Sequence, residues 1–451
     1  MLASRARVCA AIALGVFACH DQAAPTDPPK PAVVAVAVAV ADAAPVLVPV
    51  AASGSTGSGS GRGSGAGSTS PAAAPAPGGV DFITDVRLLF RVVACGGDGP
   101  LPDAMGHGDP ARAAKVQKIV DAHCAALKPY MDKFRAEYFD TARAWFVAHE
   151  PADLPPTVVY PFGGGDVVSA LVAFPDATEI TTMSLELAGD PRHLTELSPA
   201  DLEKSLHAFR VEIGALIWVG SNSSINLSAA QRNAIPAQLS SHLLGLATGG
   251  YEPTSVRYFV LADDGAIHYL DQAELDADPK NGKSLRGNWK SPAFAQAFAN
   301  VEVRYRKVGE TPAVERVHRH IGWNLANDNL KAHPEVLRHL EAKGKVSVCV
   351  KGASYLLWLA DFSTIRQYLL DHLVWMVSDS TGIPPNLAVG MQQEAFGTFD
   401  APIIDKVEGR KEDLASRKLW HATKQPMPFR FGYLDKANHK HLMITKPAAA
   451  P

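Results

Sequence analysis

The stretch Thr157–Leu187, TVVYPFGGGDVVSALVAFPDATEITTMSLEL, gives the clearest indication of the fold class of this chain. A β-branched apolar run (TVVYPF) leads into three consecutive glycines, Gly163, Gly164 and Gly165, and a helical pattern then begins near Asp166. A second strand-like run (EITTMSLEL) follows the helix. A strand, a turn, a helix and a second strand in this order form a βαβ unit with parallel strands. The stretch therefore predicts a Rossmann-like α/β fold.

The segments on both sides of this unit extend the pattern. Between Ala111 and Glu150, apolar side chains recur at helical spacing, so we expect a helical region before the α/β part. After the unit, helical and strand-like segments alternate, which predicts a parallel-rich mixed sheet with antiparallel additions. The expected helices are 198–213, 334–342 and 361–372, and the expected strands are a hairpin at 255–270, strands near Val301 and Val314, and runs at 345–350, 373–380, 429–434 and 441–445.

The N-terminal residues have the composition of an export signal. Arg5 and Arg7 precede the apolar run Val8–Ala18, which is too short to span a bilayer. The stretch VFAC, which ends at Cys19, resembles the lipobox of bacterial lipoproteins, in which the cysteine is acylated after cleavage. We therefore expect a lipoprotein-type signal peptide at 1–19 with lipidation at Cys19. A plain secretory signal and an uncleaved anchor are the alternatives.

A segment rich in Ala, Pro, Gly and Ser follows at 20–79. Its apolar part is interrupted by Asp42, Pro45 and Pro49, and its run of Gly and Ser has no apolar surface to bury, so we expect a flexible tether. His20 stands where Asp is associated with inner-membrane retention, which favours the outer membrane. The predicted organisation is a signal peptide at 1–19, a tether at 20–79, a helical region at 80–150 packed on the main domain, and an α/β domain at 151–447.

Cysteine usage fits an exported protein. Of the five cysteines, Cys9 and Cys19 belong to the signal and the lipidation motif. Cys95 lies in a glycine-rich loop and Cys124 lies early in a helix, so we predict a disulfide between them. Cys349, in the apolar run KVSVCV, is expected to be a buried strand residue rather than a nucleophile.

The charge of the chain limits its partners. The formal net charge is −3 and the pI is near 6.6, which gives no global attraction to nucleic acid or to anionic lipid. The basic residues of VEVRYRKV, at 301–308, alternate with apolar ones and are read as the outer face of a strand. The expected partners are the membrane, through the N-terminal lipid, and an unknown small molecule or envelope protein, with no nucleic acid.

The glycine turn carries the sharpest chemistry in the sequence. Three glycines let the backbone turn tightly and approach a ligand, and Asp166 would cap the next helix. Glu186 lies at the end of the second strand, where Rossmann-like folds hold an acidic group against ribose hydroxyls. The pattern also resembles the first cofactor-binding unit of the methyltransferase fold. However, the dinucleotide fingerprint has a glycine where Val168 stands, and Asp166 would repel a phosphate. A purely structural turn is the alternative, and no cofactor is expected.

The same region resembles a known group of proteins. The runs VYPFGGGD at 159–166, KGASYL at 351–356 and SDSTGIP at 378–384 are similar to an uncharacterised group of bacterial exported proteins and lipoproteins with a YPFSGPD-like motif. The similarity covers most of Pro155–Tyr433, and two glycines replace the Ser and Pro of SGPD. The group has no assigned activity. The resemblance implies export and a shared α/β domain, without a reaction.

A second polar group follows a later strand. Asp379, Ser380 and Thr381 lie where that strand ends in a loop, which is where open α/β sheets bind ligands. An ordinary turn is the alternative, and the absence of a GxSxG motif argues against a serine hydrolase. His318 and His320 would share one face of a strand, but no HExxH motif is present, so no metal site is expected.

Two functional classes remain. The sequence favours a membrane-tethered envelope lipoprotein whose α/β domain binds a ligand or a partner without catalysis, because no catalytic set of residues can be assembled from spacing. The alternative is a diverged Rossmann-like enzyme, either a transferase or a hydrolase. No catalytic residue is assigned, and the candidate ligand-binding residues are Tyr160, Gly163, Gly164, Gly165, Asp166, Glu186, Asp379, Ser380 and Thr381.

Overall fold

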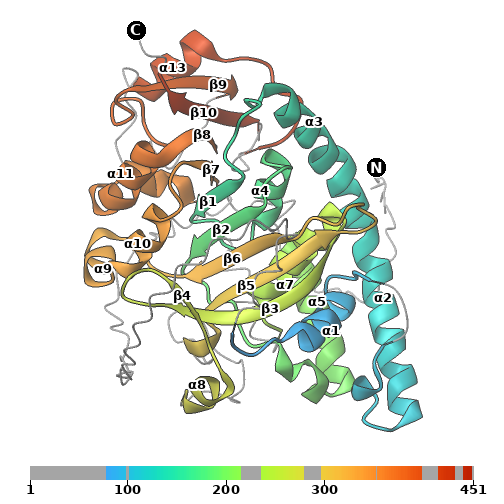
Figure 1. Cartoon of the computed structure of the whole chain (residues 1–451). Helices are drawn as coiled ribbons and strands as arrows, with labels where there is room; N and C mark the ends of the chain where they lie inside the picture. The colour runs from blue at the N-terminus through green and yellow to red at the C-terminus, as the bar shows by residue number, and fades with distance from the viewer. Residues whose placement is uncertain are drawn as a thin grey trace, which may run out of the picture. The chain divides into compact units, whose positions relative to one another are not determined.

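A ten-stranded sheet forms the centre of the described structure, with the strand order β4-β3-β5-β6-β2-β1-β7-β8-β10-β9 (Figure 1). The computed structural model describes residues 78–97, 101–214, 235–278, 296–351, 353–398, 415–431 and 440–448. They belong to one compact unit, Ala74–Pro451. The predicted signal peptide and nearly all of the predicted tether lie outside the described residues. The strands are β1 Thr157–Pro161, β2 Glu179–Ser184, β3 Tyr251–Leu261, β4 Ile267–Tyr269, β5 Asn300–Lys307, β6 Arg316–Gly322, β7 Val346–Val350, β8 Leu373–Ser378, β9 Met391–Gly397 and β10 His441–Pro447.

Five neighbouring strands form the parallel part of the sheet. Strand β1 pairs in parallel with β2 and β7, β2 pairs with β6, and β7 pairs with β8. Numbered along the chain, these strands have the order 3-2-1-4-5, which is that of a doubly wound Rossmann-like sheet. Helix α4 (Val167–Ala173) connects β1 to β2. The predicted α/β class and the βαβ unit are confirmed.

Antiparallel strands extend the sheet on both sides, as predicted. On one side β5 pairs with β6 and β3, and β3 and β4 form the hairpin expected at 255–270. On the other side β10 lies antiparallel to both β8 and β9. The sequence does not predict β9, because its residues, MQQEAFG, lack an apolar alternation. Of the run expected at 429–434, Phe431 forms an isolated bridge with Lys440, and residues 432–434 lie outside the described ones.

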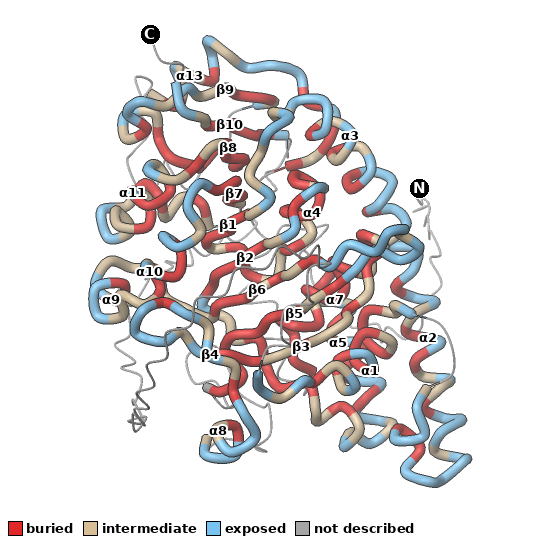
Figure 2. Tube along the Cα trace, viewed as in Figure 1, coloured by how far each residue is buried: buried red, intermediate tan, exposed pale blue. Residues whose placement is uncertain are grey.

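Helices cover both faces of the sheet (Figure 1). Val158 and Tyr160 of β1 face one core, with side chains of α1, α2, α3, α4, α5 and α7, whereas Val159 between them faces a second core with α9, α10 and α11. The central strands are buried, and most exposed residues lie on the outer helices and loops (Figure 2). The helices are α1 Ile83–Val92, α2 Pro110–Phe134, α3 Asp140–His149, α5 Pro199–Gly214, α7 Ala237–Gly249, α8 Gln272–Ala277, α9 Asn327–Ala332, α10 Glu335–Glu341, α11 Ser363–His372 and α13 Ala415–Thr423.

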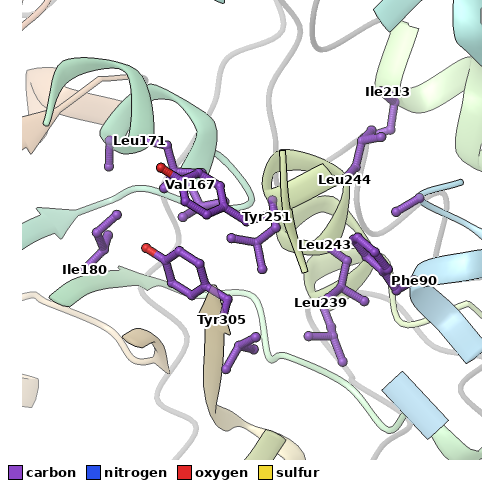
Figure 3. Close-up of a cluster of buried hydrophobic side chains, with 14 of the residues drawn as sticks. Phe90, Val167, Leu171, Ile180, Ile213, Leu239, Leu243, Leu244, Tyr251 and Tyr305 are labelled. Atoms are coloured by element: carbon purple, nitrogen blue, oxygen red, sulfur yellow. The ribbon is translucent and has the colours of Figure 1, made fainter. Parts of the chain in front are cut away.

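The larger core joins the βαβ unit to α7. Figure 3 shows Val167 and Leu171 of α4, Ile180 of β2, and Leu239 and Leu243 of α7 gathered in one apolar cluster. These side chains are buried, with exposed fractions of 3% or less. Burying large aliphatic side chains stabilises the fold by about 2 kcal/mol each. The apolar pattern of DVVSALVAF therefore fixes α4 between the sheet and α7.

The helical region predicted at 111–150 is confirmed and contains an irregularity. A π-helical segment, Arg135–Phe139, joins α2 to α3. The wider turn changes the phase of the helix, and Tyr138 and Phe139 are both buried. The predicted disulfide between Cys95 and Cys124 is present and ties the segment after α1 to α2. Among the helices of the described ranges, none is both long and apolar enough to cross a membrane.

Candidate functional site

The loop after β1 has an unusual backbone. Phe162 and Gly164 both have positive φ values, of 60° and 52°, and the first is rare for a bulky residue. A Cβ atom at Gly163 would stand 3.0 Å from the ring of Tyr160, which is a tight contact that glycine avoids. Asp166 caps α4, because its Oδ1 accepts a hydrogen bond from the backbone N–H of Ser169 at 3.1 Å. The local sequence thus places Asp166 at the carboxyl end of β1.

An ion pair joins this loop to the end of β7. The Nζ atom of Lys351 lies 3.4 Å from Oδ2 of Asp166 and donates a hydrogen bond to Oγ of Ser169 at 2.9 Å. Tyr160 Oη donates to the same Oδ2 at 3.0 Å, and Ser169 Oγ donates to it at 2.7 Å. The Lys351 and Asp166 side chains keep 23% and 29% of their surface exposed. This pair lies between β1 and β7, where the strand order reverses and where open α/β sheets bind ligands.

Aromatic rings hold the lysine in place. Its Nζ lies 5.3 Å from the ring centroid of Tyr138 and 5.2 Å from that of Phe431, which are cation–π distances. Tyr138 comes from the π-helical segment, and its hydroxyl lies 3.3 Å from Ser169 Oγ. A widened helical turn therefore brings a tyrosine to the ion pair.

Burial and charge set the protonation states around the pair. Burial lowers the pKa of Lys351, but Asp166 together with Tyr138 and Cys349 more than offsets burial, and the pKa of Lys351 is raised above its usual value. Burial, reinforced by Asp166, raises the pKa of Tyr160 well above its usual value. The thiol of Cys349, a fully buried strand residue as predicted, also has a pKa raised well above its usual value, chiefly by burial. Lys351 is therefore charged at neutral pH, and Tyr160 and Cys349 are not.

Asp379, Ser380 and Thr381, at the end of β8, form a second polar cluster, and all three residues are buried. Asp379 Oδ1 accepts hydrogen bonds from Ser354 Oγ at 2.6 Å, from Thr381 Oγ1 at 2.6 Å and from the Thr381 backbone N–H at 2.8 Å. Asp379 Oδ2 has no hydrogen-bond partner among the described residues. The Ser380 backbone N–H donates to Nδ1 of His441 at 3.2 Å. Asp379, Ser380 and Thr381 thus stay together at the end of β8, as expected from the sequence.

A group of histidines lies between the glycine turn and Glu186. His318 and His320 share one face of β6, as predicted, and both contact Thr182 Oγ1, at 2.9 and 3.1 Å. His320 Nε2 donates to the backbone oxygen of Glu186 at 2.7 Å. His242, on α7, donates from Nε2 to the backbone oxygen of Gly164 at 3.1 Å. The rings of His242 and His318 pack edge to face, with their centroids 4.4 Å apart.

The carbonyl groups of the glycine turn are therefore bound by α7. Ser241 Oγ donates to the backbone oxygen of Gly165 at 3.0 Å, beside the bond from His242. Gly163 and Gly164 are buried, and the N-terminal N–H of Ser169 is already taken by Asp166. The Asp166 cap thus occupies an N–H at the start of α4, a kind of donor that a dinucleotide phosphate uses in a Rossmann-like fold.

Burial keeps these histidines uncharged. It lowers the pKa of His318 to about 3 and that of His320 to about 4, and it lowers the pKa of His242 well below its usual value. Nearby imidazoles add to the lowering for His242 and His318. Within the part of the chain that the structure describes, the Nδ1 atoms of His242 and His318 have no hydrogen-bond partner.

Within the described ranges, one group of three possible metal ligands brings its atoms within 4.8 Å of one another: Cys95, His123 and Cys124. The two sulfur atoms are bonded to each other. His123 Nε2 donates to the backbone oxygen of Val93 at 2.9 Å, and its Nδ1 lies 2.8 Å from a guanidinium nitrogen of Arg210. Both sulfur atoms and both ring nitrogens of His123 already have partners, so the group is a structural disulfide with a histidine packed beside it rather than a metal site.

The structure joins some candidates and separates others. Tyr160, Gly163–Gly165 and Asp166 form one site with Lys351, whereas Glu186 lies across the histidine group from the glycine turn. The sequence does not single out Lys351, although a lysine directly after a buried strand, KVSVCVK, is a signal for it. Comparison of the chain with protein-family models, with curated proteins and with solved structures found no match.

Proposed function

We propose that the α/β domain binds a small ligand without catalysing a reaction, at the ends of β1 and β7. The observation that carries this proposal is the Asp166–Lys351 ion pair, which lies at the reversal of strand order and keeps contact with solvent. The strained turn at Phe162 and the π-helical segment that supplies Tyr138 support it, because such irregularities gather at functional sites.

The protonation states favour binding over catalysis. A lysine that acts as a base or nucleophile must lose its proton near neutral pH, but the Asp166 carboxylate raises the pKa of Lys351. The raised pKa values of Tyr160 and Cys349 keep both groups neutral. Ser169 is fully buried and hydrogen-bonded to both members of the pair. Among these residues no activated nucleophile has a base beside it.

The location of the protein is part of the same proposal. The lipobox-like stretch at Cys19 and the tether predicted at 20–79 support a location in the cell envelope, anchored by an N-terminal lipid, with the outer membrane favoured. The Cys95–Cys124 disulfide supports this location, because structural disulfides persist in oxidising compartments. The ligand in this setting is a small molecule or part of an envelope partner.

A thermal-shift screen of the full chain tests the site. Nucleotides, adenosyl cofactors, sugars, amino acids and divalent metals are each added to the wild type and to Lys351→Met. The expected result is that a ligand raises the melting temperature of the wild type by mass action and that Lys351→Met removes the shift. The control is Lys128→Met, which breaks an exposed ion pair with Asp132 on α2. A shift that survives in Lys351→Met would move the binding site elsewhere.

A diverged enzyme is the second candidate, and Asp379 favours it. The carboxylate is fully buried, its Oδ2 has no partner in the described ranges, and such a group is a place for a substrate donor or a water. Under this alternative an adenosyl cofactor shifts the melting temperature and Gly164→Val abolishes the shift. The enzyme alternative fails if no cofactor binds while Gly164→Val remains folded.

A further inference from the structure

The histidine cluster of His242, His318 and His320 has one set of proton positions that satisfies its hydrogen bonds. The backbone oxygen of Glu186 can only accept, so Nε2 of His320 carries a proton and its Nδ1 is left as an acceptor. Thr182 Oγ1 lies 3.1 Å from this Nδ1 and donates the hydroxyl proton to it. The same oxygen accepts from Nε2 of His318 at 2.9 Å. Both histidines of β6 are therefore neutral, with the proton on Nε2.

His242 has the same proton position. Its Nε2 donates to the backbone oxygen of Gly164, which can only accept, and the side-chain amide of Gln238 lies 3.2 Å from the same nitrogen. Nδ1 of His242 and Nδ1 of His318 therefore keep their lone pairs, and neither has a hydrogen-bond partner among the described residues. A second proton on either ring would lack an acceptor, and one on Nδ1 of His320 would face a hydroxyl donor. The folded arrangement thus opposes a second proton on each of the three rings.

A charge on one ring also opposes a charge on the next. All three side chains are fully buried, so a charge there is not stabilised by water. The ring centroid of His242 lies 4.4 Å from that of His318 and 5.0 Å from that of His320. Positive charges at these distances repel each other, and burial strengthens the repulsion.

Charged groups on the neighbouring elements do not neutralise the cluster. α4 and α7 carry no aspartate, glutamate, lysine or arginine, and the residues of β5 that pair with His318 and His320 are valines. The charged residues around the cluster are Asp166 after the turn, Glu179 of β2, Glu186 after β2, and Arg316 and Arg319 of β6. Asp166, Glu179 and Arg316 are held in ion pairs with residues outside the cluster. Arg319 lowers the pKa of His318 further, and Glu186 raises that of His320, where burial nonetheless dominates.

A second proton therefore needs water to reach the layer between α7 and β6. We propose that the histidine cluster is an acid-sensitive switch: at low pH α7 moves away from β6, the three imidazoles take up protons, and the glycine turn loses its contact with His242. The buried leucines of α7 make this open state rare at neutral pH, and each proton taken up makes it less rare. β7 and β8 lie on the far side of β1 from the cluster, so they can stay paired while α7 opens. The switch does not require a ligand at the ion pair.

Hydrogen exchange of the full chain, measured by mass spectrometry at pH 7.5 and 5.5, tests the switch. Each exchange rate is divided by the intrinsic rate of the same amide at that pH, which gives the equilibrium constant for opening. A histidine exposed by opening titrates near pH 6.5, so each of the three contributes about tenfold between these two pH values. The opening constant of α7 and of residues 162–166 is therefore expected to rise about a thousandfold. At pH 5.5 it should exceed that of β7 and β8 by at least about tenfold, because opening of α7 leaves the sheet paired.

Glutamine variants count the histidines that take up protons. In His242→Gln and His318→Gln the side-chain amide can still donate to Gly164 and to Thr182, but one titrating ring is lost. Each single variant is expected to show a rise of about a hundredfold between the two pH values, and the double variant a rise of about tenfold. The control is His207→Gln, at an exposed histidine of α5, which should keep the thousandfold rise. Circular dichroism confirms that each variant is folded.

Two results would overturn the proposal. Equal rises in the wild type and in the double variant would mean that α7 opens without protonation of the cluster. A single opening constant shared by α7, β7 and β8 at pH 5.5 would mean that the histidines are exposed only when the whole domain unfolds. The second comparison uses the wild type alone, so it decides even where a variant does not fold.

Discussion

Asp379 shows how a single buried carboxylate organises the end of β8. One oxygen, Oδ1, accepts three hydrogen bonds from Ser354 and Thr381, and these link the loop after β8 to the segment after β7. Trp358 closes the same loop by donating from Nε1 to the backbone oxygen of Gly382 at 2.7 Å. The loop conformation therefore depends on one side chain that the solvent does not reach.

Replacement of this carboxylate is expected to be costly. Asp379→Ala removes the acceptor of three buried donors, and we expect a loss of about 2 to 4 kcal/mol in the free energy of unfolding. Urea denaturation followed by circular dichroism measures it. The matched control is Asp361→Ala, at an exposed aspartate, which should change stability by less than about 0.5 kcal/mol. Equal stability of the two variants would mean that the hydrogen bonds of Asp379 contribute little.

At the scale of elements, the approach of α7 to α4 depends on a glycine. A Cβ atom at Gly245 would stand 2.8 Å from Cγ1 of Val167, a buried and β-branched side chain with little freedom to move. α7 also carries Ser241 and His242, which bind the carbonyl groups of the glycine turn. The close packing of the two helices thus maintains the turn after β1.

The Gly245→Ala variant is expected to be less stable than the wild type by about 1 to 3 kcal/mol, because the new methyl group pushes α7 away from α4. Thermal denaturation of the variant and of the wild type measures this difference in stability. Gly214→Ala is the control, since no atom of the described residues lies within 4 Å of the added Cβ at the end of α5, and its stability should be unchanged or slightly higher. If Gly245→Ala matched Gly214→Ala, the two helices would have room to adjust.

The histidines between α7 and β6 make stability depend on pH. The folded pKa of His318 is lowered to about 3, whereas an unfolded histidine titrates near 6.5. The unfolded chain therefore binds protons first as the pH falls. The contribution of His318 is fully present above pH 6.5 and is lost progressively as the pH falls from 6.5 toward 3.

We therefore expect the free energy of unfolding to fall between pH 7.5 and 5.5, and to fall by about 1 kcal/mol less in His318→Gln than in the wild type. Urea titrations at both pH values give the two differences. Comparing each protein with itself across pH removes the effects of the substitution that do not involve protonation. Identical decreases in both proteins would show that His318 is not protonated on unfolding in this range.

At the scale of the whole molecule, the disulfide connects regions that the sheet does not hold together. Cys95 follows α1 and Cys124 lies in α2, and the bond closes a loop with a sequence separation of 29. Cross-linking restricts the unfolded chain, and a loop of this length corresponds to about 3 to 4 kcal/mol in the chain-entropy model. The cross-link thus stabilises the helical region more directly than it stabilises the sheet.

The double variant Cys95→Ser/Cys124→Ser is expected to lose about 3 kcal/mol in its free energy of unfolding relative to the oxidised wild type. Guanidinium denaturation with and without a reducing agent measures the loss. The reducing agent should lower the stability of the wild type and leave the double variant unchanged. A wild type insensitive to the reducing agent would contradict a stabilising role for the bond.

The pattern of the sequence predicts the fold to a useful extent. The βαβ unit, the parallel centre, the antiparallel additions, the helical region and the disulfide are all readable from local spacing, because alternation and helical periodicity reflect which side chains face a core. The sequence does not predict β9, because its residues lack an apolar alternation and its pairing with β10 is what makes it a strand. The π-helical segment is not predicted either, because the helical spacing of the apolar residues gives no sign of the change of phase at Arg135–Phe139.

The candidate site was also predictable only in part. The local pattern predicts that Tyr160, the glycine turn and Asp166 stand at the end of β1, since these residues are close along the chain. The pairing of Lys351 with Asp166 and the contact of His242 with the turn depend on the folded arrangement, because residues far apart along the chain meet only when the strands are ordered and the helices packed. Local patterns record burial, whereas the partner of a buried charge depends on how the whole sheet is assembled.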